Sequence, residues 1–169
     1  VTQDGGGKNL VLRGISQPKH ITEHYQMLVG KKSDCKNEAN EIVYTFEDDL
    51  QRPMRMAVRL YNDGVAFRYE LENLQHTAIT QDLTTYHIEE GIRRWIQSWT
   101  ESYENFFPLS TTGKETTADG KKGKQHWGYP ALLQQDDVFA LITESGIERY
   151  NSASSLKNGQ NPEDYHVSL

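Results

Sequence analysis

Apolar and polar residues alternate along residues 54–60 and again along residues 65–71. Because successive side chains of a β-strand point to opposite faces of a sheet, this period of two predicts a pair of half-buried strands. The apolar members of the two runs are Met54, Met56, Val58, Leu60, Val65, Phe67, Tyr69 and Leu71. No window of the chain carries a convincing helical stripe, so this alternation constrains the fold more than any other feature.

The connection between the two runs contains Asp63 and Gly64, a pair that can adopt the positive φ angles of a type I′ turn. If these are the two loop residues, Leu60 faces Phe67 and every apolar side chain of both runs lies on one face. Arg59 then lies on the opposite face. The sequence therefore predicts a β-hairpin that turns at Asp63 and Gly64.

Other stretches of β-branched and aromatic residues between turn signals predict further strands. They cover residues 25–29, 42–46, 78–88, 93–99, 129–133 and 138–143. Pro130 places the strand at residues 129–133 near a sheet edge or a strand start, because proline has no N–H to donate to the neighbouring strand. Two polar connections, residues 110–124 and 151–164, are expected to be exposed and mobile. Many strands with hydrophilic connections indicate an all-β, antiparallel β-sandwich.

Charge and apolar content exclude several classes of protein. A net charge of −6 argues against a nucleic-acid partner, which would need a basic face to neutralise phosphate. No apolar run approaches the roughly 20 residues of a membrane span, so no membrane partner is expected. The single cysteine, Cys35, excludes an internal disulfide. The composition stays compatible with a protein that binds neutral sugars or calcium.

Residues 58–71 (VRLYNDGVAFRYEL) resemble a signature in the N-terminal domain of glycoside hydrolase family 97. Four further segments resemble that domain and follow in the same order, namely WI at 95–96, YE at 103–104, YPAL at 129–132 and FALITE at 139–144. Upstream, residues 23–41 resemble a segment in which the family often has tryptophan where this chain has Tyr25 and Leu28. The resemblance covers residues 16–169, and the ordered set is more specific than any single segment.

The resemblance implies a fold and a role. The fold would be a galactose-mutarotase-like super-sandwich that lacks its first strands. Residues 1–15 would form a disordered or tag-like start and a first strand, and residues 16–169 a partial N-terminal β-sandwich domain. The role would be that of an accessory domain of an exo-acting α-glucosidase or α-galactosidase. The family places its catalytic carboxylates on a (β/α)8 barrel that this sequence does not contain, so no catalytic residue is assigned. Preference for glucosides or galactosides, and inversion or retention, would depend on that barrel.

The resemblance also implies partners and a location. The partners would be the protein's own catalytic barrel and an α-linked oligosaccharide. Family members are usually exported, so a periplasmic or exported location is expected. A sheet edge left open by missing strands would favour self-association.

Glu144 follows the apolar run of residues 138–142 and is the strongest single candidate for a site residue. In the family that the chain resembles, a glutamate at this place reaches the barrel and helps to bind calcium at the active site. Calcium prefers oxygen ligands and needs more of them than one carboxylate offers, so Glu144 is expected to bind it only within the full-length enzyme. Without the resemblance, Glu144 reads as a solvated residue at a strand end.

Aromatic and carboxylate side chains interleave between residues 95 and 104. Sugars present apolar ring faces and hydroxyl edges, which suit aromatic platforms beside carboxylates and amides. A substrate-binding strip is therefore expected from Trp99, Glu101, Tyr103 and Glu104. The alternative is that Trp95 and Trp99 both fill the sandwich core. His126, which lies beside Trp127 and Gly128, could contact a sugar, but a loop position is favoured.

Three other functions stay open. The chain could be a stand-alone carbohydrate-binding β-sandwich that uses Trp99 and Tyr103, an aldose-epimerase-like sandwich enzyme, or a purely structural or assembly component. Independent hydrolysis is not expected, because it would need a carboxylate pair at a defined separation across a sugar. Glu101 and Glu104 are close in sequence, but the sequence does not supply that geometry.

Overall fold

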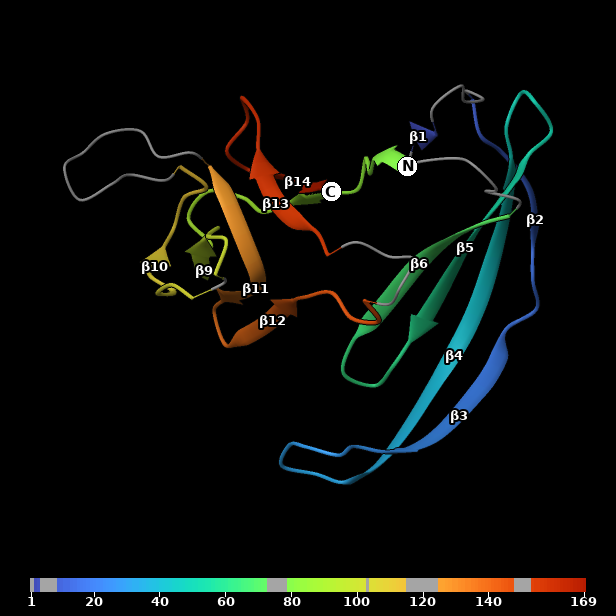
Figure 1. Cartoon of the computed structure of the whole chain (residues 1–169), viewed down its shortest axis with the longest axis horizontal. Coiled ribbons are helices and arrows are strands. Elements are labelled where there is room, and N and C mark those ends of the chain that lie inside the picture. The colour runs from blue at the N-terminus through green and yellow to red at the C-terminus, as the bar shows by residue number, and fades with distance from the viewer. Residues whose placement is uncertain (1, 4–8, 73–78, 103, 115–124, 148–152) are drawn as a thin grey trace. The chain divides into compact units, whose positions relative to one another are not determined.

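The computed structural model describes residues 2–3, 9–72, 79–102, 104–114, 125–147 and 153–169 (Figure 1). Every regular element in these ranges is a β-strand, and every strand pairing is antiparallel. The predicted all-β, antiparallel fold class is therefore confirmed. Over the same ranges, no helix has the length and apolar character to cross a bilayer.

The strands divide between two compact units, which are described separately. The first unit, Gly5–Ala78, is built around a long central strand and is called the β4 sheet. Its strands are β2 (Val11–Ile15), β3 (Lys19–Gln26), β4 (Asp34–Glu47), β5 (Pro53–Leu60) and β6 (Val65–Leu71). Strands β2 and β3 follow one another along one edge of β4, whereas β5 pairs with its other edge and β6 extends the sheet.

The predicted hairpin is present as β5 and β6, but its turn lies one residue earlier than expected. Leu60 pairs with Val65 rather than facing Phe67, and the Tyr61 N–H donates to the Gly64 carbonyl over 2.8 Å. The loop residues are therefore Asn62 and Asp63, and neither they nor Gly64 has a positive φ. Moving the turn by one residue shifts each cross-strand partner by two positions. The predicted division into one apolar and one polar face is therefore preserved.

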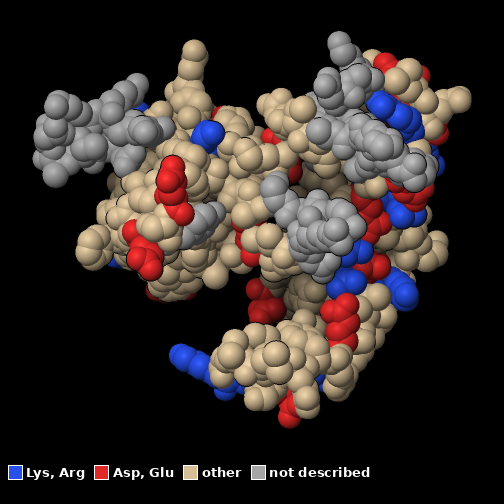
Figure 2. Space-filling model, in the orientation of Figure 1, with Lys and Arg blue, Asp and Glu red and all other residues tan. Residues whose placement is uncertain are grey.

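The polar face of the β4 sheet is covered by ion pairs between neighbouring strands. The Arg59 guanidinium contacts Glu41 at 2.7 Å on β4 and Glu23 at 2.9 Å on β3. These contacts raise the pKa of Arg59 further above its ordinary value. Arg55 contacts Glu70 of β6 at 3.1 Å. Lysine and arginine side chains alternate with aspartate and glutamate over this part of the surface (Figure 2).

Two of the predicted strands in this unit have different limits. Residues 25–29 were expected to be a strand, but β3 ends at Gln26, and Leu28 is fully exposed in the turn that follows. The strand expected at residues 42–46 is the last part of β4, which is much longer. The first half of β4 is polar because one of its faces carries charged side chains, so no alternation of apolar and polar residues predicted a strand there.

The second unit, Val1–Asp4 with Ile79–Leu169, is called the β11 sheet after its central strand. The main sheet contains β8 (Thr85–His87), β9 (Arg93–Ser98), β10 (Leu109–Ser110), β11 (His126–Gln135), β12 (Val138–Ile142), β13 (Ser155–Asn158) and β14 (Asp164–Ser168). The strand order is β10-β9-β11-β13-β14-β8, and β12 also pairs with β11. A separate two-stranded sheet joins β1 (Thr2–Gln3) to β7 (Ile79–Gln81).

One face of the β11 sheet carries a continuous buried core. Its members are Ile88, Ile96, Trp127, Tyr129, Ala131, Leu156 and Tyr165. A charged side chain lies on the same face, since Arg94 is only 1% exposed. The Arg94 guanidinium donates to the Tyr165 hydroxyl at 2.9 Å and to the Glu89 carbonyl at 2.7 Å, so its burial is compensated by neutral acceptors.

Three sequence expectations in this unit were wrong. Within the region 78–88, the structure forms two short strands, β7 and β8, in different sheets. Pro130 lies in the middle of β11, where the pairing with β9 is irregular between Gly128 and Leu132, rather than at an edge or a strand start. The region 151–164, expected to be an exposed loop, contains β13 and the fully buried Leu156. Most of the other polar connection, residues 115–124, lies outside the described residues.

Candidate functional site

Glu144 follows the end of β12, and its carboxylate is held by one serine. The Ser154 backbone N–H donates to both carboxylate oxygens, at 3.0 and 3.2 Å, and the Ser154 hydroxyl donates to Oε2 at 2.7 Å. Glu144 is half-buried and Ser154 is buried. The interpretation of Glu144 as a freely solvated residue is therefore wrong, because three donor contacts fix the orientation of its carboxylate.

Tyr129 of β11 belongs to the same cluster. Burial, with nearby Tyr86 next in importance, raises the pKa of Tyr129 far above its ordinary value, and a hydrogen bond with Ser154 opposes this shift. Glu144 also contributes to the rise through its negative charge. Tyr129 is therefore a neutral phenol at physiological pH and does not act as a base. The cluster offers one carboxylate that could bind a cation, held by neutral hydroxyl and amide groups.

The cluster fits calcium only in part. Calcium takes roughly six to eight oxygen ligands, and one carboxylate supplies at most two of them. The described residues contain no group of three or more His, Cys, Asp or Glu side chains that could hold a metal ion. A carboxylate has about four lone-pair positions, so Glu144 retains acceptor capacity beyond its contacts with Ser154. It can therefore serve as one ligand of a site whose other ligands come from elsewhere.

Trp99 lies just after β9, outside the buried core, and is 36% exposed. Its indole stacks on the imidazole of His126 with 4.7 Å between ring centroids and 5° between ring planes. His126 Nε2 lies 2.8 Å from the Ser155 hydroxyl, which is buried and donates to the Ser168 carbonyl. His126 is the first residue of β11, so the prediction that favoured a loop position for it was wrong. The stack gives Trp99 a fixed orientation.

The suggestion that both tryptophans fill the core was also wrong. Ile96 faces the core, so Trp95 and Trp99 belong to the opposite face of β9. The Arg93 guanidinium lies over the Trp95 ring at 5.2 Å from its centroid, and Trp95 is only half-buried. Gln97, between the two tryptophans, is 2% exposed, and its amide donates weakly to the Tyr129 carbonyl at 3.4 Å. This face of β9 is therefore aromatic but not part of the core.

Among the described residues, neither Glu101 nor Glu104 makes a polar contact with Trp99. Glu101 and Glu104 are both exposed, and in the described part of the chain no hydrogen bond or ion pair links either carboxylate to the indole. Tyr103 lies outside the described residues. The roles of Trp99, Glu101, Tyr103 and Glu104 in binding a substrate stay predictions.

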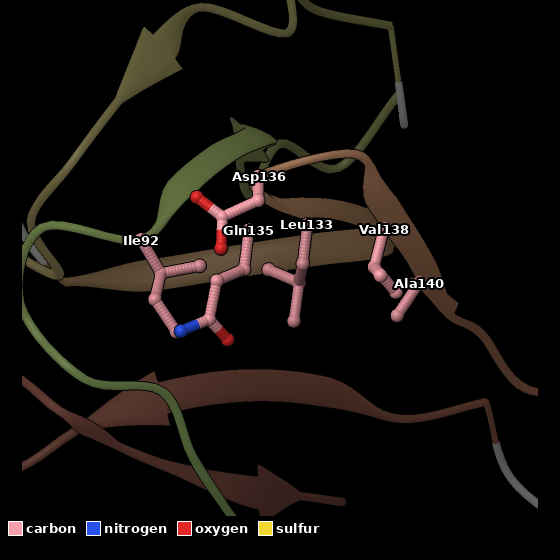
Figure 3. A pocket seen from close by; sticks show the side chains of 6 residues that line it. All are labelled: Ile92, Leu133, Gln135, Asp136, Val138 and Ala140. Atoms are coloured by element: carbon pink, nitrogen blue, oxygen red, sulfur yellow. The ribbon is translucent and has the colours of Figure 1, made fainter.

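An open hollow of about 300 Å³ lies beside the turn between β11 and β12. Figure 3 shows its lining of Ile92, Leu133, Gln135, Asp136, Val138 and Ala140. Most of these side chains are apolar, and none of the predicted site residues is among them. The hollow has no aromatic platform for a sugar ring and one carboxylate only, so it is a weaker candidate than the Glu144 cluster or the Trp99 stack.

Comparison with known proteins identifies the family. The family described as Glycosyl-hydrolase 97 N-terminal matches residues 2–169. The chain belongs to this family. The resemblance seen in the hairpin segment and in the ordered motifs is thereby confirmed for the whole length of the chain.

Individual relatives of this glycosyl-hydrolase 97 N-terminal chain are distant. A probable retaining alpha-galactosidase from Streptomyces bingchenggensis (strain BCW-1) is 23% identical over 149 residues, which are 88% of this chain and 22% of that protein. A solved beta-arabinopyranosidase structure matches 99% of the chain and 28% of its own length, with a TM-score of 0.81 and 22% identity. A glycoside hydrolase family 97 enzyme from Pseudoalteromonas sp. strain K8, in complex with acarbose, matches 95% of the chain and 24% of its own length, with a TM-score of 0.72 and 20% identity. The chain therefore spans about a quarter of the length of these relatives.

Sequence reasoning missed several residues of this family member that shape its candidate sites. Ser154 precedes a strand that was not predicted, so nothing in the sequence linked it to Glu144. His126 lies beside Trp127 in the sequence, yet its partner Trp99 follows a different strand, β9. The charge of Arg94 predicts a position on the surface, but its side chain is buried.

Proposed function

We propose that this chain is the accessory N-terminal domain of an exo-acting α-glycosidase. In this role it packs on a (β/α)8 catalytic barrel, closes one side of the sugar pocket and supplies Glu144 to a calcium ion there. Membership of the glycosyl-hydrolase 97 N-terminal family supports the role. The relatives that carry such a domain include a probable alpha-galactosidase and an enzyme in complex with acarbose, which supports an α-linked oligosaccharide as the substrate.

The observation that carries the proposal is the fixed carboxylate of Glu144. A glutamate that served only to keep a strand end soluble would need no donors of its own. Here one serine supplies two donor groups to it, with the shortest contact at 2.7 Å. Such outer contacts orient metal ligands and tune their basicity in metal sites generally. Glu144 is thus prepared to meet a cation with little loss of conformational freedom.

Bound calcium would supply a positive charge that polarises oxygen atoms of the substrate. Glu144 would hold one side of that ion, and Ser154 would keep the carboxylate aligned. The acid and base groups that cleave the glycosidic bond would come from the barrel, so this chain alone is not catalytic. α-Glucosidase activity and export to the periplasm are parts of the proposal that rest on the family resemblance.

The test uses a protein in which this chain is joined to a catalytic barrel. Glu144→Gln should weaken calcium affinity by at least about tenfold, because the neutral amide replaces one charged oxygen ligand. Hydrolysis of an α-glycoside should fall in parallel and recover when calcium is raised. Asp137→Asn, which removes an exposed carboxylate from the β11–β12 turn, is the matched control and should change neither. Unchanged calcium affinity in Glu144→Gln would remove Glu144 from the site.

A second candidate function is carbohydrate binding by the chain itself, and the exposed stack of Trp99 on His126 favours it. Calorimetry with maltooligosaccharides and α-galactosides tests this candidate on the isolated chain. Binding that is lost in Trp99→Ala supports it, whereas no heat of binding with either sugar class contradicts it.

Self-association through an open sheet edge is a further part of the proposal. Strand β12 is the best candidate in the described part of the chain, where it pairs only with β11. Its side chains Val138, Phe139 and Leu141 are exposed and apolar. Light scattering checks this property, and Leu141→Lys should shift the chain toward the monomer.

A further inference from the structure

A single row of residues crosses the outer face of the β11 sheet. His126 of β11 pairs with Lys157 of β13, Lys157 pairs with His166 of β14, and His166 pairs with Thr85 of β8. Trp99, which donates its backbone N–H to the His126 carbonyl at 2.8 Å, extends the row at the β9 side. These five residues, Trp99, His126, Lys157, His166 and Thr85, are called the His-Lys row.

The row faces away from the core. The residues next to it along their strands are Trp127, Leu156, Tyr165 and Tyr86, all of which belong to the core or pack against it. Because neighbouring residues of a strand point to opposite faces, the row lies on the outer face. His126 is half-buried, and the other four residues are exposed. Neighbouring strands lie about 4.8 Å apart, so the row spans a distance suited to a chain of sugar rings rather than to one ring.

The chemistry of the row is selective. Trp99 stacks on His126 at one end of the row, and Thr85 Oγ1 lies 2.8 Å from His166 Nδ1 at the other end. Lys157 lies between the two imidazoles, and no ion pair involving its ammonium group occurs among the described residues. None of the five residues is acidic. The nearest carboxylate on β14, Asp164, contacts His87 at 2.7 Å and Asn161 at 2.8 Å.

We propose that the His-Lys row binds a saccharide that carries a carboxylate group, with a sugar ring against Trp99 and the carboxylate on Lys157. The exposed Trp99 indole suits an apolar ring face, and the ammonium group suits an anion placed two strand spacings away. A nucleic acid fits poorly, because the row holds one lysine and the chain has a net charge of −6. The inference rests on the second candidate function above, to which it adds the class of ligand.

Calorimetry on the 169-residue chain tests the inference with two matched probes. The probes are α-1,4-linked trigalacturonate and its fully methyl-esterified form, which has the same rings and linkages but no charge. We expect the acid to bind about fivefold more tightly than the ester at low salt, with the difference shrinking as salt screens the carboxylate.

Two variants locate the site. Lys157→Gln should weaken binding of the acid about fivefold and leave the ester unchanged, because it removes only the exposed charge. Trp99→Ala should weaken both probes roughly tenfold, since it removes the apolar platform. Lys19→Gln, which removes an exposed lysine from β3, is the control of equal charge change and should have no effect. Circular dichroism checks that each variant keeps its β-sheet signal.

The outcomes separate the two proposals. Equal binding of acid and ester, or an acid preference that survives in Lys157→Gln, overturns recognition of the carboxylate by the row while leaving carbohydrate binding intact. Binding of neither probe, together with no binding of maltooligosaccharides or α-galactosides, overturns both the inference and the second candidate function.

Discussion

The two sheets of this chain are held together in different ways. The β11 sheet has a continuous core around Leu156 and Tyr165, both fully buried, and it buries a guanidinium group as well. In the described part of the β4 sheet, the buried side chains are Ala39, Met54 and Ala57 only. Ion pairs connect its strands instead: one joins β2 to β4, and others join β3, β4, β5 and β6 across the polar face. Both candidate sites, the Glu144 cluster and the Trp99 stack, belong to the β11 sheet.

This difference shows where precise positioning is available. A packed core fixes the strands that carry outward side chains, so residues on the other face inherit defined positions. Exposed ion pairs add little free energy each and hold long side chains loosely. The β4 sheet has its register set by alternation and cross-strand pairing, which organises a sheet but does not prepare a binding site.

The largest expected effect is that of the same truncation in the two sheets. Leu156→Ala should lower the free energy of unfolding by about 3–4 kcal/mol, because it leaves a cavity in the core. Leu60→Ala, at a residue that is 54% exposed, should lower it by less than about 1 kcal/mol. Urea unfolding followed by circular dichroism measures both. Similar losses of unfolding free energy in Leu156→Ala and Leu60→Ala would contradict the proposed difference between the two sheets.

A smaller effect is expected from removing one arginine from each sheet. Arg94→Met should lower the free energy of unfolding by about 2–3 kcal/mol, because the buried Tyr165 hydroxyl would lose its partner and the partly buried bond to the Glu89 carbonyl would also be lost. Arg59→Met should cost no more than about 1 kcal/mol, since its ion pairs are partly exposed. The same urea experiment applies, and a larger loss in Arg59→Met would reverse the ranking.

The smallest effect concerns His87 and Asp164, which form an ion pair at the β8 edge of the β11 sheet. The hydrogen bond between them raises the pKa of His87 above its ordinary 6.5 and lowers that of Asp164 below its ordinary 3.8. The contribution of His87 to stability is present below pH 6.5 and is lost as pH rises through its raised pKa. The contribution of Asp164 is present above pH 3.8 and is lost as pH falls through its lowered pKa. The pair should therefore stabilise the edge most between these two values.

Proton NMR titration of the His87 ring checks this prediction. The pKa of His87 should lie above 6.5 and fall toward that value in Asp164→Asn. An Asp164→Asn variant in which the pKa of His87 is unchanged would show that the pair does not form in solution.

Much of the fold could be predicted from the sequence, because alternation reports the faces of strands directly. The β5–β6 hairpin was predicted with the correct faces, but its turn was placed one residue late, since Asp63-Gly64 suggested a turn type that the chain does not adopt. Strand β13 was missed because Leu156 is surrounded by serine, asparagine and lysine, and one apolar residue gives no period. The first half of β4 was missed for a similar reason.

The candidate sites could be predicted only in part. Glu144 and Trp99 stood out from the residue types and the family resemblance. The contacts that orient them come from Ser154 and His126, which depend on strand pairings between distant segments. The outward position of Trp95 and Trp99 follows from the burial of Arg94, which no hydrophobic pattern indicates.

Hydrogen exchange of backbone amides, read by NMR at single residues, tests the central claim that the β11 sheet is the rigid part that positions the candidate sites. Amides of β11 and β13 that pair at Trp127 and Leu156 should exchange only through large-scale opening and be the slowest in the chain. Amides of β3 and β6 should exchange faster, through local opening of a sheet with little buried apolar surface. Equal protection in the two sheets, or slower exchange in β3 and β6, would contradict the account.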